Sequence, residues 1–150
     1  MKFRALSLVA LLAASTAVAD DTPEMSARYR HVVMDGVGSH MKASGLIVKG
    51  EVSRTSDLAV HAKAIHDASL TFDQLFPKGS GPDAVPKTEA LPKIWADWDG
   101  FVKANKTFQE ASAAFVKAAE GGKMEEIKPA FGALGKSCGG CHDEYRKDED

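Results

Sequence analysis

Residues 136–147 read KSCGGCHDEYRK, and the two cysteines in this stretch decide how the rest of the chain is interpreted. Cys138 and Cys141 are the only cysteines among the 150 residues, and His142 directly follows the second one. An α-helix turns by about 100° per residue, so on a helix these three side chains fall within an arc of about 100°. Two thiols and an imidazole therefore share one helical face, with only Gly139 and Gly140 between the cysteines.

The order C-x-x-C-H is the pattern that attaches a c-type haem. Both thiols can reach one edge of a porphyrin and add to its two vinyl groups, while the imidazole turns its free nitrogen to the iron. Glycines cost a helix about 1 kcal/mol each relative to alanine, but they leave no side chain against a flat macrocycle. The motif predicts one covalent haem c held by Cys138 and Cys141, with His142 as an iron ligand.

A C-x-x-C pair also serves as a disulfide or a thiol redox centre, and cysteines and histidines also bind zinc. Thioredoxin-like redox motifs lie in a strand–helix context, and no segment of this sequence shows the alternation typical of a strand. Zinc needs four ligands, and the remaining histidines show no matching pair spacing. Haem attachment is therefore the favoured interpretation of the motif.

The chain begins with MKFRALSLVALLAASTAVA, residues 1–19. Lys2 and Arg4 precede an apolar run, and Ala17-Val18-Ala19 forms a small-x-small cleavage signal. The apolar run is shorter than the roughly 20 residues that cross a bilayer. We therefore expect a signal peptide cleaved after Ala19, export to the periplasm and no stable membrane insertion. Export agrees with the motif, because c-type haem is attached outside the cytoplasm.

The charge of the chain argues against some classes of partner. The formal net charge is −2, and removal of Lys2 and Arg4 with the leader lowers it to −4. A mildly acidic protein of this kind is not expected to bind nucleic acid or to be drawn strongly to a membrane surface. Residues 20–150 are enough for one domain with one core.

Four segments carry apolar residues at helical spacing: residues 23–49, 55–76, 92–120 and 124–147. Tyr29 and Trp98 belong to these stripes, and we expect both in the core. Thr22 is placed to cap the first segment. A loop rich in proline and glycine, residues 78–92, separates the second segment from the third. Together these features predict an all-α fold, an antiparallel four-helix bundle with covalently bound haem.

Several stretches of the chain resemble the class II cytochromes c, the cytochrome c-prime family. They are RYRHVVM at 28–34, KGE at 49–51, LFP at 75–77, TEALPKIW at 88–95 and CHDEYRK at 141–147. The resemblance covers nearly all of the chain after the leader, and the motif lies near the C-terminus as in that family. It implies a four-helix bundle with the haem between helices, often as a homodimer. It also implies that His142 is the proximal ligand and that Arg146 lies beside it.

The resemblance places Met34 on the other face of the iron. In some relatives an apolar side chain here covers the iron, and nitric oxide or carbon monoxide binds; in low-spin relatives a methionine ligates it. Met34 and Met41 lie within about 60° around a helix but about 10 Å apart along it, so only one can meet the iron. His31 and Met41 remain alternative ligands. Arg30, one turn before Met34, is close enough to pair with a haem propionate.

The interpretation that follows is a periplasmic monohaem cytochrome that carries single electrons, with axial ligation by His142 and Met34. Its partners would be other redox proteins, met transiently. The alternative is a five-coordinate haem protein that binds nitric oxide or carbon monoxide. A thiol–disulfide or weak peroxidase enzyme is disfavoured, because no distal acid–base residue is evident. The remaining histidines are interpreted as surface or internally bonded: His40, His61 and His66.

Overall fold

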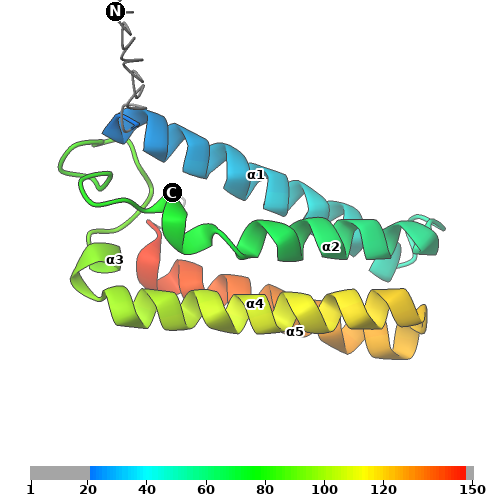
Figure 1. The fold of residues 1–150 in the computed structure, drawn as a ribbon. Coiled ribbons are helices and arrows are strands. Elements are labelled where there is room, and N and C mark those ends of the chain that lie inside the picture. Colours follow the sequence, from blue (N-terminus) through cyan, green and yellow to red (C-terminus); the bar gives the residue numbers. More distant parts are fainter. Residues whose placement is uncertain (1–20, 148–150) are drawn as a thin grey trace, which may run out of the picture.

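The computed structural model describes residues 21–147, and in this range the chain is an up-and-down bundle of four long helices (Figure 1). The predicted signal peptide, residues 1–19, lies outside the described residues. Among residues 21–147, every helix is too short or too polar to span a lipid bilayer. The long helices are α1 (Pro23–Val48), α2 (Leu58–Ser69), α4 (Trp98–Gly121) and α5 (Met124–Tyr145).

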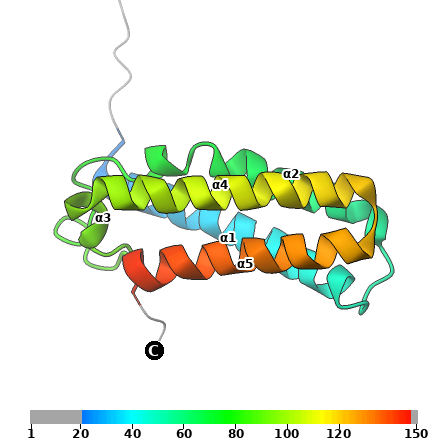
Figure 2. The same ribbon diagram turned by 90° about the horizontal axis from the view of Figure 1, so that it is seen from below.

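Two antiparallel helix pairs make up the bundle. Helix α1 packs on α2, α4 packs on both α2 and α5, and α1 meets α5 at only a few positions. Figure 2 shows α5 running alongside α4. The start of α1, the loop 78–92, the short helix α3 (Lys93–Ala96) and the end of α5 gather at one end of the molecule, on the left in Figure 1. The all-α bundle predicted from the sequence is confirmed.

The first helix begins as its sequence predicts. The hydroxyl of Thr22 accepts a hydrogen bond from the amide of Met25, and Pro23 occupies the first turn, where its missing N–H has no role. Helix α4 ends at Gly122, whose φ of 71° is a left-handed conformation that glycine adopts without steric cost. The turn after it leads directly into α5.

The second predicted helix is shorter than expected. Helix α2 ends at Ser69, and Phe72–Leu75 forms a separate 3-10 turn after it. A second 3-10 turn, Thr55–Asp57, lies directly before α2. The hydroxyl of Ser69 donates a hydrogen bond to the carbonyl oxygen of His66, so this carbonyl has a partner without an amide from the next helical turn. Local hydrogen bonds of this kind compete with helix propagation, which apolar spacing alone does not reveal.

The third predicted helix is also interrupted. Helix α3 ends at Ala96, and Asp97 leaves the helical conformation with φ −126° and ψ 59°. Its carboxylate then caps α4 by accepting from the amide of Gly100 at 3.2 Å. An aspartate at this position satisfies amides that have no partner inside the new helix. One predicted segment is therefore two helices joined at a capping residue.

The core follows most of the predicted stripes. Six large side chains are fully or almost fully buried: Leu58, Ile65, Ile94, Phe115, Ile127 and Leu134. Two members of the stripes were placed wrongly: Tyr29 is 61% exposed and Trp98 is 38% exposed. The side chain of Trp98 covers the edge of the core, with its ring centroid 5.5 Å from that of Phe101. The ring of Tyr29 lies on the outer face of α1.

The end of α5 is tied to the middle of the chain. The hydroxyl of Tyr145 donates to Asp97 at 3.0 Å, and the carbonyl of Tyr145 accepts from the amide of Leu91 at 2.9 Å. The amide of Lys147 donates to the carbonyl of Glu89 at 2.8 Å.

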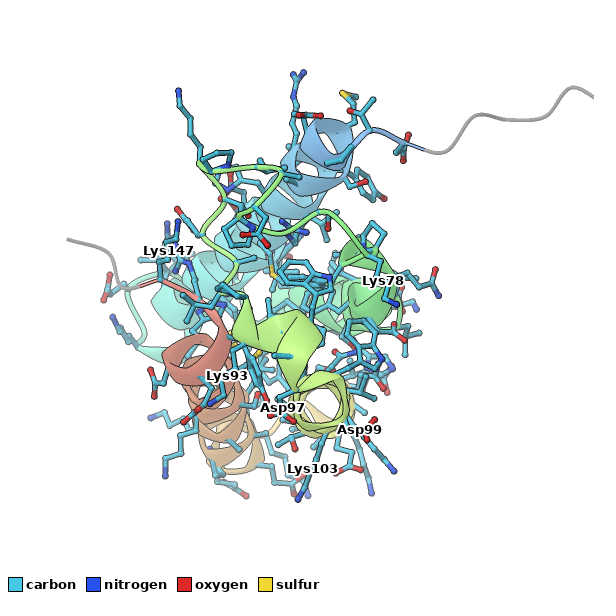
Figure 3. The ribbon with its side chains drawn as sticks, turned by 90° about the vertical axis from the view of Figure 1, so that its left-hand side faces the viewer. Lys78, Lys93, Asp97, Asp99, Lys103 and Lys147 are labelled. Atoms are coloured by element: carbon cyan, nitrogen blue, oxygen red, sulfur yellow. The ribbon has the colours of Figure 1, made fainter. Side chains whose placement is uncertain are left out.

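An ion pair adds to these hydrogen bonds, because Lys93 pairs with the carboxylate of Glu144. Figure 3 looks at this end of the bundle, with Lys93, Asp97 and Lys147 labelled. Side-chain and backbone contacts thus fix the helix that carries the C-x-x-C-H motif.

We expect Gly100→Ala to loosen this attachment. A Cβ at residue 100 would collide with the carboxylate of Asp97 and lie 2.6 Å from the hydroxyl of Tyr145. Such overpacking costs about 1–3 kcal/mol, and urea unfolding should show a loss of free energy of that size. The matched control is Gly132→Ala in α5, where no neighbouring atom lies within 4 Å of the added methyl. The control should be neutral or stabilising; equal destabilisation by both changes would contradict this account.

Candidate haem-binding site

The two thiols of the motif lie near the C-terminal end of α5 and are half-buried, whereas His142 is exposed. They form no disulfide. Burial raises the pKa of the Cys138 thiol, and burial together with the neighbouring charge of Cys138 raises the pKa of Cys141 to about 11. Both cysteines are therefore protonated at neutral pH, which is unlike the depressed pKa values of redox-active C-x-x-C pairs.

The surface beside the motif is open. A Cβ added to Gly139 or Gly140 would have no neighbour within 4 Å. A groove of about 570 Å³ runs between α4 and α5, and Cys141, Gly140 and Tyr145 form part of its wall. The glycines thus leave one flank of the motif without side chains, as a flat ring bonded to the two sulfurs requires.

Helix α1 brings a second set of apolar side chains to the bundle interior. Val33, Met34 and Met41 are half-buried and pack against the core, as do Cys138 and Cys141. His31, by contrast, is exposed and pairs with Asp35 at 3.4 Å. The structure therefore places the two methionines, and not His31, on the inner side of α1.

Arg30 is a buried cation with neutral partners. Its side chain is 5% exposed, and its guanidinium donates to the carbonyl of Leu75, to the hydroxyl and carbonyl of Ser80, and to the hydroxyl of Thr88, at 2.9–3.2 Å. It also lies over the ring of Phe76, with Cζ 4.7 Å from the centroid. Burial lowers the pKa of Arg30. Within residues 21–147 no carboxylate pairs with Arg30.

Burial of a charge without a counter-ion is unfavourable. An anionic group that reached Arg30 would offset this desolvation, and a haem propionate is such a group. The residues present thus fit a haem: two half-buried thiols, an open flank, an apolar α1 face and a buried cation that lacks an anion. The sequence did not predict the cradle around Arg30. The residues around Arg30 belong to the LFP and TEALP stretches of the sequence, which supply Leu75, Phe76 and Thr88.

Arg146 lies just beyond the end of α5, whereas the sequence analysis placed it inside the last helix. The prediction extended the last helix to Lys147, which puts Arg146 one turn beyond His142 on the same face. Helix α5 ends at Tyr145, and Arg146 is extended, with φ −120° and ψ 147°. Its guanidinium donates to the carboxylate of Glu89, with Nε 2.9 Å from Oε2. The ion pair and the Ala90–Arg146 bridge hold this residue to the loop before α3. Its role beside the imidazole stays a prediction.

Comparison with known proteins decides the family. The sequence profile described as Cytochrome C′ matches residues 26–146. The chain belongs to the cytochrome c′ family. It is 35% identical to cytochrome c′ of Rhodospirillum rubrum over 142 residues, 95% of each chain. It is also 33% identical to cytochrome c-554 of Cereibacter sphaeroides over 147 residues, again 95% of each chain. The cofactor of this cytochrome c′ chain is one covalent haem c, and the chain has two cysteines for it.

Solved structures of the family have the same fold. A nitric oxide complex of a cytochrome c′ variant from Alcaligenes xylosoxidans superposes with a TM-score of 0.79 at 26% identity, covering 87% of this chain and 100% of that chain. A carbon monoxide complex of another variant from that organism gives a TM-score of 0.77 at 27% identity, covering 85% and 98%. Both likenesses extend over the whole four-helix bundle.

Arg30→Met tests the buried cation. The change removes the guanidinium that donates to Leu75, Ser80 and Thr88, and buried acceptors that lose a charged donor cost about 3 kcal/mol in total. We expect the free energy of unfolding of the haem-loaded protein in urea to fall by about that amount. Arg28→Met, an exposed arginine half a turn away, is the control and should have little effect. Equal stability of the two variants would contradict the structural role of Arg30.

Proposed function

We propose that Cys138 and Cys141 hold the haem through two thioether bonds and that His142 is its proximal ligand. The support is the arrangement of the motif: two half-buried thiols on the inner side of α5, an imidazole in the next position, and an open flank at the glycines. The bound haem supplies an iron that accepts an axial ligand or an electron. Arg30 is proposed to receive a propionate in its cradle.

We propose that the protein binds nitric oxide or carbon monoxide on the face of the haem opposite His142. The observation that carries this proposal is the likeness to relatives whose structures are nitric oxide and carbon monoxide complexes. The residues of this chain that would line the gas site are apolar: Val33 and Met34 on the inner side of α1. They provide no charge or strong donor for water or an anion, so they favour a small uncharged ligand. The proposed location is the periplasm.

A second candidate function is electron transfer with transient redox partners, in which Met34 ligates the iron. It is supported by the thioether itself, which lies half-buried on the side of α1 that faces the interior. A methionine ligand raises the reduction potential of a haem. In that case the bundle would hold both axial ligands nearly fixed and keep the reorganisation on electron transfer small.

Absorption spectra of the purified protein distinguish the two functions. A gas-binding site predicts a high-spin ferric spectrum and rapid carbon monoxide binding by the ferrous form. Met34→Ala should leave the spin state unchanged, because the side chain only covers the iron. Met41→Ala, about two turns further along α1, is the matched control.

Two results would contradict these assignments. A low-spin ferric spectrum with a methionine-to-iron charge-transfer band, converted to high spin by Met34→Ala, would support the electron carrier instead. A mature chain with the mass of the bare polypeptide, from cells able to attach haem, would contradict the roles of Cys138 and Cys141.

We also propose that the protein forms a homodimer through the outer face of α1. Met25, Tyr29 and Val32 are spaced four and three residues apart there, and each exposes more than half of its side chain. An exposed apolar stripe with a central aromatic residue is typical of an interface.

Tyr29→Glu should weaken this dimer. Loss of a central aromatic contact costs about 2 kcal/mol or more, which is a rise of about 30-fold in the dissociation constant. Analytical ultracentrifugation at several concentrations measures it. Val102→Glu, at an exposed position of α4, is the control and should leave the dissociation constant of the dimer unchanged. A protein that is monomeric at every concentration contradicts the proposal.

A further inference from the structure

Two histidines meet between α1 and α2. Nδ1 of His40 lies 2.9 Å from Nδ1 of His61, and the two half-buried rings are 5.2 Å apart at their centroids with an angle of 50° between them. At this distance one ring donates its Nδ1 proton and the other accepts it, so at least one of the two rings is neutral. Neutral imidazoles are the form in which histidine binds metal ions.

This pair is separate from the proposed haem site. His40 follows Met34 by six residues, which places the two side chains about 120° apart around α1. His61 is on α2, which carries no residue of the C-x-x-C-H motif. His66, the other histidine of α2, is engaged elsewhere, with Nδ1 3.0 Å from the hydroxyl of Ser112. The contact between His40 and His61 therefore needs an explanation of its own.

We propose that His40 and His61 form a two-histidine site for a divalent transition-metal ion, with Cu²⁺ preferred. Metal–nitrogen bonds of about 2.0–2.1 Å place two nitrogens about 2.9 Å apart at the 90° angle of adjacent square-planar positions, and about 3.3 Å apart at a tetrahedral angle. The observed separation of 2.9 Å matches the first arrangement. Square-planar or tetragonal nitrogen sites suit Cu²⁺ and Ni²⁺, and Cu²⁺ is bound more strongly.

Binding requires a shift of one proton and a rotation of the two rings. The ring that donates from Nδ1 moves its proton to Nε2, and both rings turn so that their Nδ1 lone pairs converge on the metal instead of on each other. No residue is oxidised, and water fills the other metal positions. Within residues 21–147 no group of three or more metal-binding side chains is found, so the site has two protein ligands.

An ion pair lies close to the two histidines. Asp57 is one turn before His61, and its pKa is lowered chiefly by a hydrogen bond from Arg54. Arg54 pairs with this carboxylate, so the two imidazoles themselves are the groups that would hold the ion. The site links the two helices, so a bound ion would also stabilise the packing of α1 on α2.

Copper titration of the haem-loaded ferric protein tests the site, since ferric haem cannot reduce Cu²⁺. Calorimetry should show one equivalent of Cu²⁺ bound, and electron paramagnetic resonance should show two nitrogen ligands. His40→Ala and His61→Ala should each weaken Cu²⁺ binding at least about tenfold. Mutation of a residue that only hydrogen-bonds to a metal ligand already lowers metal affinity about tenfold, and loss of the ligand itself should cost at least as much. His66→Ala is the matched control on α2 and should bind as the parent does.

The haem absorption spectrum reports whether each variant is folded, and His40→Gln replaces His40→Ala if the alanine variant does not fold. Three outcomes would overturn the proposal: no stoichiometric binding by the parent protein, equal binding by the parent and both pair variants, or an equal loss in His66→Ala. Because the test reads copper and not gas binding or redox activity, it is independent of the proposed haem function.

Discussion

The burial of one guanidinium constrains the end of the bundle where the C-x-x-C-H motif lies. Arg30 is removed from water without a carboxylate, so its N–H groups must find other acceptors. Leu75, Ser80 and Thr88 supply them, and in doing so they fold the loop between α2 and α3 over the start of α1. Loop conformation and helix position are thus determined together. The remaining imbalance of charge is what makes this cradle suited to an anion such as a propionate.

The same loop also fixes the helix that bears the motif. After Thr88 the chain pairs with the end of α5 through backbone hydrogen bonds, and Asp97 joins α4 to Tyr145. A line of contacts therefore runs from Arg30 through the loop to the last turn of α5. Helices α1 and α5, which are proposed to approach the haem from different sides, are positioned by one segment that carries none of the residues proposed to bind the iron or the porphyrin.

Much of this could be predicted from the sequence. The motif, the number of long helices and the cap at Thr22 depend on local patterns, and the structure confirms the helices and the cap. The breaks at Ser69 and Asp97 were missed, because side-chain hydrogen bonds end a helix without changing its apolar spacing. Tyr29 was predicted to lie in the core. The helical spacing of apolar residues is the same for a stripe that faces the core and for a stripe on the outer face of a helix, so spacing alone could not place it. The cradle around Arg30 needed contacts between residues 45 to 58 positions apart.

The tight turn at Gly122 has a consequence for how the chain assembles. Helices α4 and α5 are neighbours in sequence and pack along each other, as do α1 and α2. Contacts close in sequence form quickly, because little chain entropy is lost in closing them. We expect each hairpin to form early and the two to dock later, when the long loop 78–92 closes. In the half-assembled chain Cys141 would lie beside the groove between α4 and α5, and the side of α5 that faces α1 would still be accessible to a bulky planar group.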